Sequence, residues 1–321
     1  MSGVCLLIAD TFEPTADLLV AELRRRGVAC MRWNLDRYPL EAGLTYRAAN
    51  GRFEVELTGD GRRLDLADVA SVWCRSLLPS GFPEELEAQD RAFAETGARR
   101  ALDALTTVCD PLWVNHPVRQ RLANSKPAQL HAARRVGLDI PATVITNDPA
   151  AARESIAGGA GETVYKSLSQ NLDLDPGTGL YTGVVTETEL ANLDLIRLTP
   201  GIFQERIAKA YELRVTVVGT RIFSARIDSQ ARAETALDWR RRPFDVDDRP
   251  VDLPAEIEAG VLALMDALGL VYGAFDFIVT PDGRHVFLEV NPGGQYMWVE
   301  AGTGLPITAA LADTLAAPCR G

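Results

Sequence analysis

The stretch FDFIVTPDGRHVFLEVNPGG, residues 275–294, decides the fold expected for this chain. Two short apolar runs flank a Pro-Asp-Gly turn, and Asp-Gly between such runs predicts a β-hairpin because both central residues of a type I′ turn need a positive φ. A two-residue loop at Asp282 and Gly283 fixes the register by counting outward. The expected pairs are Phe275 with Val290, Phe277 with Leu288, Val279 with Val286, Ile278 with Phe287, and Asp276 with Glu289. One face of the hairpin is then wholly apolar, and the other carries two acids directly opposite each other.

The facing acids Asp276 and Glu289 need an explanation, because like charges directly opposite in a sheet are destabilising. Asn291 follows two residues later on the same face, and glycines at 293 and 294 let backbone approach a ligand closely. Two carboxylates and an amide oxygen are hard ligands that suit Mg²⁺, which usually binds substrate phosphates as well. The alternative is an exposed hairpin face with two solvated acids and a helix-capping Asn. We expect the metal site, and we expect removal of one acid to relieve repulsion in the metal-free chain.

Composition and charge set the class of protein. The chain has 321 residues, 47% hydrophobic and 24% charged, which is typical of a globular protein with two or three packed units. A net charge of -11 argues against a nucleic-acid or anionic-membrane partner. Five scattered cysteines without a C-x-x-C pair indicate reduced, packed thiols in a cytoplasmic protein. The opening apolar run lacks a basic flank and is too short for a signal or a membrane span, so a first strand is expected there.

Lysine is rare in this chain. Of 33 basic residues only Lys126, Lys166 and Lys209 are lysine, so a remaining lysine suggests a place where a compact ammonium is needed for phosphate. Lys166 lies in the predicted strand ETVYKSL and is followed by the glycine-rich stretch at 169–185. Such a stretch suits a lid over phosphates, because its backbone N–H groups can bind anions, and a plain surface hairpin is the alternative. We expect Lys209→Arg to be tolerated.

Strand and helix patterns alternate along the chain, which predicts an α/β fold with α+β elements. Residues 1–115 open with a βαβ pattern and a hairpin at Asn50-Gly51, residues 116–190 contain Lys166 and the glycine-rich stretch, and residues 191–321 end with the hairpin that carries the acids. The stretch from Arg121 to Gly137 reads as one helix, and no G-x-G-x-x-G follows the first strand. We expect three domains with these bounds.

The ordered set of Lys126, Lys166 with its glycine-rich loop, FQERI, ELR, Asp276 and FLEVNP resembles the ATP-grasp superfamily. Within it, SVWCRS, DSQ at 228–230 and DWR at 238–240 resemble the ribosomal-peptide maturases that make microviridin-like graspetides. The resemblance covers essentially the whole chain. It implies a pre-ATP-grasp domain followed by central and C-terminal domains that clasp ATP.

The resemblance also assigns roles to individual residues. Lys126 and Lys166 match the two lysines that bind the ATP phosphates, while Asp276, Glu289 and Asn291 match the Mg²⁺ ligands. The resemblance further implies roles for Gln204, Glu205 and Ile207 at the adenine, for Arg214 and Arg226 near the transferred phosphate, and for Trp239 and Arg240 at the peptide substrate. A two-residue turn at Gly219-Thr220 places Arg214 and Arg226 on opposite faces of their hairpin, so either a bulge intervenes or only one serves.

The family's chemistry is that of an ATP-dependent ligase. ATP activates Asp or Glu side chains of a precursor peptide, with a leader and an acidic core, as acyl phosphates. Attack by Thr, Ser or Lys side chains then gives macrocyclic esters or amides. An amino-acid or peptide ligase of the same superfamily and a nucleotide-binding regulator without turnover are the alternatives. We expect neither a nucleic-acid nor a membrane partner, and a homodimer is left open.

Overall fold

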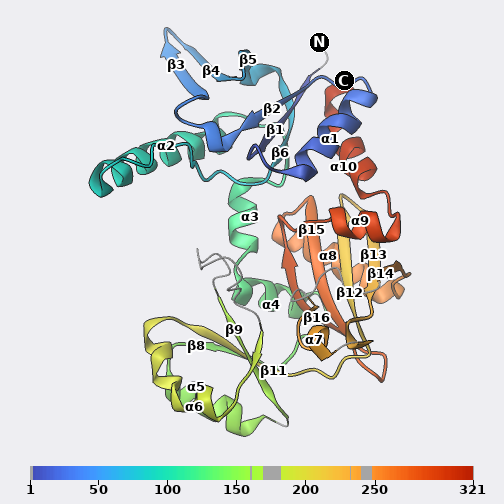
Figure 1. Cartoon of the computed structure of the whole chain (residues 1–321). Coiled ribbons are helices and arrows are strands. Elements are labelled where there is room, and N and C mark those ends of the chain that lie inside the picture. Colours follow the sequence, from blue (N-terminus) through green and yellow to red (C-terminus); the bar gives the residue numbers. More distant parts are fainter. Residues whose placement is uncertain (1–2, 160, 169–181, 232, 240–247, 321) are drawn as a thin grey trace.

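The computed structural model describes residues 3–159, 161–168, 182–231, 233–239 and 248–320 (Figure 1). Residues 169–181 of the predicted glycine-rich lid lie outside the described residues, as do Arg240, Arg241 and Arg242. Within the described ranges, no helix combines the length and the apolar character needed to cross a membrane. All five cysteines are free thiols, and Cys5, Cys30, Cys74 and Cys319 are buried.

The first part of the chain forms a parallel sheet with the strand order β2-β1-β6-β7. Its elements are β1 (Val4–Ala9), α1 (Pro14–Arg25), β2 (Cys30–Asn34), β6 (Val69–Cys74), α2 (Ala88–Val108) and β7 (Leu112–Val114). Side chains alternate between its two faces, and both faces are buried: Cys5 and Leu7 lie in the core with α1, whereas Leu6 and Ile8 lie in the core with α2. This agrees with the expected βαβ opening.

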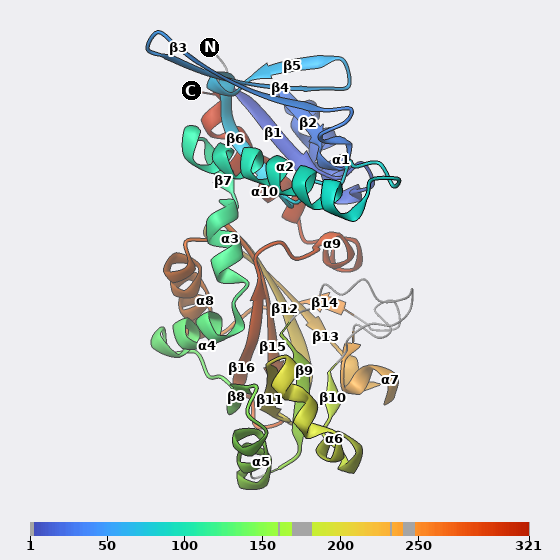
Figure 2. The same cartoon turned by 90° about the vertical axis from the view of Figure 1, so that its left-hand side faces the viewer.

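A three-stranded antiparallel ribbon covers one edge of this part of the molecule (Figure 2). It consists of β3 (Gly43–Ala49), β4 (Arg52–Gly59) and β5 (Arg62–Asp65). Ala49 pairs with Arg52, and the two residues between them, Asn50 and Gly51, both have positive φ angles of 50° and 78°. The hairpin expected at Asn50-Gly51 is therefore confirmed.

Two short helices replace the single helix predicted to end at Gly137. These are α3 (Pro117–Ala123), which runs from the parallel sheet toward the rest of the molecule, and α4 (Lys126–Arg135) (Figures 1 and 2). The break falls at Asn124 and Ser125, because Pro127 has no N–H to donate and restricts the residue before it. The single-helix prediction is wrong, and the break places Lys126 in the first turn of α4.

The middle of the chain forms a second sheet with the order β10-β9-β11-β8. Its elements are β8 (Thr143–Thr146), α5 (Pro149–Gly158), β9 (Thr163–Ser167), β10 (Gly183–Val184), α6 (Glu187–Ala191) and β11 (Gly201–Glu205). Lys166 lies on β9, and its Cα partner on β11 is Ile202. Because β11 belongs to this sheet, we propose that the central unit extends to Glu205 rather than to residue 190.

The last part of the chain forms a five-stranded sheet with the order β14-β13-β12-β15-β16. Its elements are β12 (Tyr211–Val218), β13 (Arg221–Ile227), α7 (Ala233–Ala236), β14 (Asp248–Pro250), α8 (Ala255–Leu268), β15 (Tyr272–Val279), β16 (His285–Asn291), α9 (Met297–Thr303) and α10 (Ile307–Ala316). Helix α8 covers one face and is followed by Gly269, whose φ of 65° ends the helix. Helix α10 returns to the first sheet, where it packs beside α1 (Figure 1).

Candidate active site

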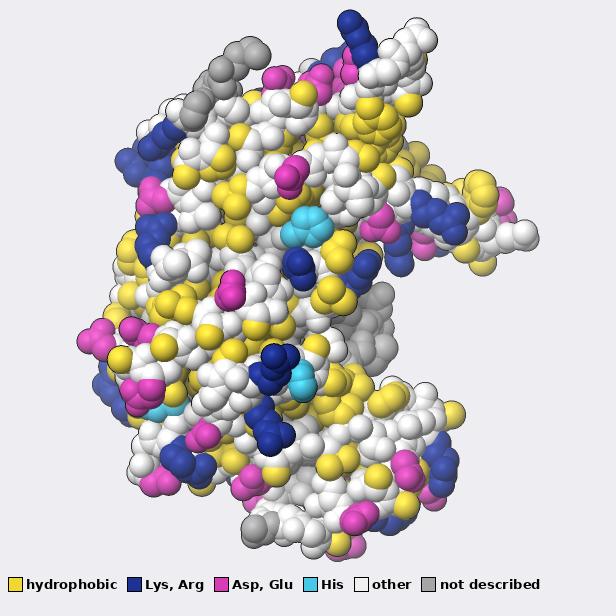
Figure 3. Space-filling model, turned by 180° about the vertical axis from the view of Figure 1, so that it is seen from behind, with side chains coloured by type: hydrophobic (Ala, Val, Ile, Leu, Met, Phe, Trp, Pro, Cys, Tyr) yellow, Lys and Arg dark blue, Asp and Glu magenta, His cyan; other side chains and the backbone are white. Residues whose placement is uncertain are grey.

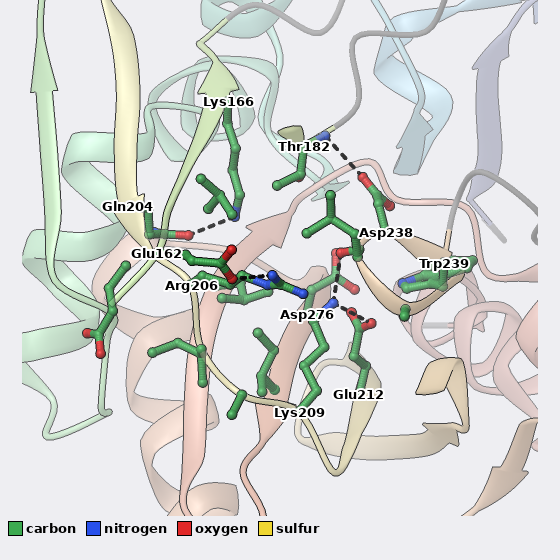
Figure 4. A pocket seen from close by; sticks show the side chains of 18 of the residues that line it. Glu162, Lys166, Thr182, Gln204, Arg206, Lys209, Glu212, Asp238, Trp239 and Asp276 are labelled. Carbon is green, nitrogen blue, oxygen red and sulfur yellow. Dashed lines mark hydrogen bonds and ion pairs between the residues drawn. The ribbon is translucent and has the colours of Figure 1, made fainter. Parts of the chain in front are cut away.

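A cavity of about 500 Å³ lies between the central sheet and the five-stranded sheet. It is lined by side chains of β9, β11, β12, β15 and β16, by the segment that joins β11 to β12, and by residues 236–239. Figure 4 shows side chains that line this cavity, among them Lys166, Gln204 and Asp276, which reach the cavity from different strands. The sequence brings them together because β11 continues directly into the segment that leads to the five-stranded sheet.

One end of the cavity is formed where β11 leaves the central sheet. Gln204, Glu205 and Ile207, the predicted adenine residues, all line it. The side chain of Gln204 is buried and fixed from both ends: its oxygen accepts a hydrogen bond from Lys166 Nζ at 2.7 Å, and its amide donates to Thr143 Oγ1 at 2.9 Å. The Gln204 side chain is therefore held in one orientation in the wall of the cavity.

The opposite end contains the acid pair. Asp276 on β15 lies directly opposite Glu289 on β16, as predicted, and Arg214 lies opposite Asp276 on its other side. Arg214 Nη1 donates to Asp276 Oδ1 at 2.9 Å, and Lys126 Nζ donates to Glu289 Oε2. Although burial alone would lower the pKa of Arg214, the charge of Asp276 and hydrogen bonding to it raise that pKa, so the guanidinium stays charged. Each acid thus has its own cation, which explains how a strand pair carries two facing carboxylates.

The hairpin that carries the acids differs from the predicted two-residue turn. Phe277 pairs with Phe287, Ile278 with Val286 and Val279 with His285, whereas Asp276 still pairs with Glu289. Two hydrogen bonds join Thr280 to Arg284: Thr280 N donates to the Arg284 carbonyl, and the Thr280 hydroxyl accepts from Arg284 N, both at 3.0 Å. The loop between these two residues therefore has three residues, 281–283. A bulge at the register shift beside Asp276 then restores the predicted pairing.

The bulge changes which side chain faces the cavity. Phe287 is fully buried in the core under α8, and Leu288 lines the cavity with Ile278. The predicted pair of Ile278 with Phe287 is therefore wrong, as are the pairs Phe277–Leu288 and Val279–Val286.

The third predicted metal ligand, Asn291, ends β16 opposite Ala274. Its side chain is exposed, and its Oδ1 accepts a hydrogen bond from Gly293 N at 3.0 Å. A Cβ at Gly294 would lie 2.6 Å from the Cβ of Ala274 and 2.9 Å from Arg214 Nη2. Glycine is thus needed here so that the backbone can pass the arginine that binds Asp276.

Two cavity residues, Glu212 and Lys209, are absent from the sequence-based site. Lys209 Nζ donates to Glu212 Oε1 at 2.8 Å and to the Leu237 carbonyl at 2.9 Å, and Ser229 Oγ donates to the same carboxylate oxygen (Figure 4). Burial raises the pKa of Glu212, opposed by Lys209. Strand alternation from Arg214 could have identified Glu212, since residues two apart share a face. Lys209, for which the sequence analysis expected a change to Arg to be tolerated, therefore lies in the cavity and pairs with Glu212.

Arg226, the second arginine predicted near the transferred phosphate, does not lie beside the acid pair Asp276 and Glu289. Strands β12 and β13 pair without a register shift, so Arg214 pairs with Ala225 and Arg226 with Leu213. Arg226 stacks over the ring of Tyr211 at 3.9 Å and pairs with Asp228 at 2.6 Å. With no bulge, the two arginines face opposite sides, and Arg214 alone lies beside the acids.

Trp239, predicted to contact a peptide, lines the cavity and is buried. Its ring packs against that of Trp298 on α9 with 4.7 Å between centroids. Arg240, the other residue predicted at the peptide, lies outside the described residues.

Comparisons with known proteins identify the family of this chain. The family model described as the MvdD pre-ATP grasp domain matches residues 6–121. The structure of a RiPP-associated ATP-grasp ligase from Chryseobacterium gregarium, in complex with ADP and a leader and core peptide, is 31% identical with a TM-score of 0.90, covering 98% of this chain and 96% of that one. Macrocyclase MdnC from Microcystis aeruginosa MRC, bound with precursor peptide MdnA, is 32% identical with a TM-score of 0.88, covering 97% and 99%.

This chain belongs to the ATP-grasp macrocyclases of ribosomal peptides. Macrocyclase MdnB from the same Microcystis strain is also similar, at 31% identity and a TM-score of 0.83, with 98% of this chain and 99% of that one covered. No curated protein matches the sequence. The family assignment makes this chain an ATP-dependent ligase with the ATP-grasp fold, as the sequence predicted.

The donor set of this ATP-grasp macrocyclase fits a Mg²⁺ ion. Among the described residues, no three Asp, Glu, His or Cys side chains gather as a metal site, and the candidate ligands are two carboxylates plus the amide of Asn291. A set with few protein ligands suits Mg²⁺, which keeps several waters and binds phosphate oxygens in addition. Lys126 and Arg214 neutralise the two acids in the absence of metal.

Proposed function

We propose that this enzyme activates Asp or Glu side chains of a ribosomal precursor peptide as acyl phosphates and joins them to Thr, Ser or Lys side chains, forming macrocyclic esters or amides. The observation that carries the proposal is the row Arg214, Asp276 and Glu289 across three adjacent strands, with Lys126 against Glu289 and Lys166 in the same cavity. Two acids that could hold a metal and the cations Arg214, Lys126 and Lys166 thus lie in or beside one cavity, which supports the proposal.

We assign the ends of the cavity as follows. Gln204, Glu205 and Ile207 hold the adenine, and Lys166 and Lys126 bind the phosphates. Asp276, Glu289 and Asn291 hold Mg²⁺, which supplies neutralisation of the phosphate oxygens when bound. Lys209 and Glu212 form the buried floor between these ends.

The reaction has two steps. A carboxylate oxygen of the peptide attacks the terminal phosphorus of ATP, the bond from that phosphorus to the bridging oxygen breaks, and ADP leaves with the electron pair. A hydroxyl or amine of the peptide then attacks the acyl carbon, loses its proton, and displaces phosphate. Arg214 stabilises the charge that spreads over the transferred group, because it is held charged and buried beside Asp276.

The reaction needs ATP and Mg²⁺, and we place it in the cytoplasm, where ATP is available and the five free thiols stay reduced. The test is incubation of the enzyme with ATP, Mg²⁺ and the precursor peptide encoded beside it, followed by mass spectrometry. Loss of one water per ring, with ester rings reopened by mild base, is the expected result. A mass gain by an added amino acid would indicate an amino-acid ligase, and an unchanged peptide despite ATP turnover would refute both activities.

A further inference from the structure

A second cavity of about 670 Å³ adjoins the first one at Glu289. Its wall comes from the loop after β6, from α2, from α3 and from the end of β16. Glu289 lines both cavities, and Asn291 and Gly293 line the second. A ligand in the second cavity would therefore lie beside Glu289, one of the two facing acids.

The charge of this wall is opposite to that of the whole molecule. Four basic side chains line it, Arg75, Arg99, Arg121 and Lys126, against the two acids Asp103 and Glu289, in a chain whose net charge is -11. Lys and Arg side chains are visible beside the hollow under the projecting helix α2 (Figure 3). A local basic cavity in an acidic protein favours an anionic ligand.

Two of the four cations are already engaged. Arg75 donates to the Gly293 carbonyl, lies 3.5 Å from Glu13 and stacks near Trp73, and Lys126 pairs with Glu289. Within the part of the chain that the structure describes, Arg99 and Arg121 make no hydrogen bond or ion pair. These two guanidinium groups, on α2 and α3, are the ones that remain able to bind a ligand.

We propose that the second cavity binds acidic side chains of the peptide that flank the reacting carboxylate, with Arg99 and Arg121 as the binding residues. This rests on the proposed function, because it takes the peptide to be the substrate. Guanidinium groups bind carboxylates in a bidentate manner, so two arginines select a segment with several acids over one with a single acid. The N-terminal unit thereby contributes to substrate choice, while the other two sheets hold the nucleotide.

The test measures peptide binding apart from turnover. The probes are the fluorescein-labelled peptide Thr-Glu-Asp-Glu-Asp-Thr and its amide counterpart Thr-Gln-Asn-Gln-Asn-Thr, titrated with the full-length enzyme in the presence of Mg²⁺ and ADP and followed by fluorescence anisotropy. The acidic peptide is expected to bind the wild-type enzyme at least about tenfold more tightly than the amide peptide, and R99A and R121A each weaken it about tenfold, as expected for loss of one charge-assisted contact. The double variant loses the preference.

Matched controls lie on the same two helices. Arg100 on α2 and Arg119 on α3 are exposed arginines that do not line the second cavity, so R100A and R119A are expected to leave the preference unchanged. Equal binding of both peptides by the wild-type enzyme, or unchanged binding by R99A and R121A, overturns the inference. Binding of a fluorescent ADP analogue is measured in parallel. Weaker ADP binding by R121A would place that arginine on the phosphates and also overturn it.

Failure of the inference is distinct from failure of the proposed function. If the precursor loses water in the mass-spectrometric test but the arginine variants bind the peptides normally, only the inference fails. If the peptides bind through Arg99 and Arg121 but the precursor mass never changes, the proposed reaction fails.

Discussion

Individual charged residues of the site are held in ion pairs: Arg214 with Asp276, Lys126 with Glu289, and Lys209 with Glu212. The sequence analysis correctly paired Asp276 with Glu289, although the loop is one residue longer than predicted, because the bulge beside Asp276 restores the register. It could not show that Arg214 and Lys126 reach them, since these cations come from residues 62 and 163 positions away in the sequence. The expectation that removing one acid relieves repulsion is therefore wrong, because each acid balances a nearby cation.

The first prediction concerns Asp276→Asn. It leaves the buried guanidinium of Arg214 without a charged partner, which is expected to cost about 2–4 kcal/mol of folding stability, in addition to the loss of Mg²⁺-dependent nucleotide binding. Thermal unfolding and calorimetric titration with Mg²⁺ and ADP measure the two effects. The control is Asp282→Asn at the exposed hairpin tip, where loss of a surface ion pair is expected to leave the melting temperature nearly unchanged. An Asp276→Asn variant as stable as the wild type would contradict the pairing argument.

The second prediction separates two lysines of the same cavity. Lys166→Met is expected to weaken binding of a non-hydrolysable ATP analogue by at least about tenfold, because Lys166 is assigned to the phosphates, and to lower the melting temperature modestly, because the buried Gln204 oxygen loses this donor. Lys209→Met leaves Glu212 buried without its cation, so it is expected to lower the melting temperature as well. If Lys166→Met binds the analogue normally, the phosphate assignment is refuted.

The third prediction uses the raised pKa of Glu212. Because burial keeps this carboxyl protonated to a higher pH in the folded chain than in the unfolded one, its contribution to stability is greatest below the ordinary value of 4.5 and falls as pH rises through the folded value. Comparison of the wild type with Glu212→Gln by thermal unfolding between about pH 4 and 7 is expected to show the difference shifting in favour of the variant as pH rises. A difference that is constant with pH, or that shifts toward the wild type, would contradict burial as the dominant cause.

At the scale of elements, the residues in and beside each turn determined whether the hairpin register could be predicted from the sequence. Asn50-Gly51 forms the expected two-residue turn because both residues adopt positive φ. At Asp282-Gly283 the Thr280 hydroxyl bonds to the backbone of Arg284, which lengthens the loop by one residue and requires a bulge to restore the register. Hydrophobic alternation cannot show such a pair of compensating shifts, because Phe287 and Leu288 are both apolar.

The bulge gives the fourth prediction. Leu288→Ala is expected to weaken nucleotide binding up to about tenfold while costing little stability, because Leu288 faces the cavity. Phe287→Ala removes a fully buried ring from the core and is expected to cost about 3–5 kcal/mol. Chemical denaturation and ADP titration of the two neighbouring variants check this. The reverse pattern would support the regular ladder that the sequence indicated.

At the scale of the whole molecule, contacts between distant segments were beyond the sequence analysis. The family resemblance correctly gave the ATP-grasp fold, but periodicity within segments could not place β11 in the central sheet or α10 beside α1. Asn115 is a further example. Its amide donates to the carbonyls of Tyr272 and Pro292, and its oxygen accepts from the N–H groups of Val271 and Tyr272. One buried side chain thus joins the end of the N-terminal unit to the sheet that carries the acids.

The fifth prediction is that Asn115→Ala strongly destabilises the enzyme. The substitution leaves these backbone groups without partners in a buried site, with an expected cost above about 3 kcal/mol. Asn124→Ala, at an exposed position between α3 and α4, is the control and is expected to change stability by less than about 0.5 kcal/mol. Denaturant unfolding of both variants measures the two changes in stability. Similar unfolding midpoints would show that Asn115 does not join the N-terminal unit to the five-stranded sheet.

The return of α10 to the first sheet has a consequence for biosynthesis. The face of that sheet that carries Cys5 and Leu7 is completed by Leu311 and Leu315, which a ribosome adds long after the sheet strands have emerged. At elongation rates of roughly 5–20 residues per second the nascent sheet waits roughly 10–40 s with this apolar face covered only by α1. A chain stalled before residue 307 lacks α10, so the part of this face that α10 covers stays exposed, and such a chain is prone to chaperone binding or aggregation. The N-terminal unit is thus synthesised first but completes its core only when the last helix is made.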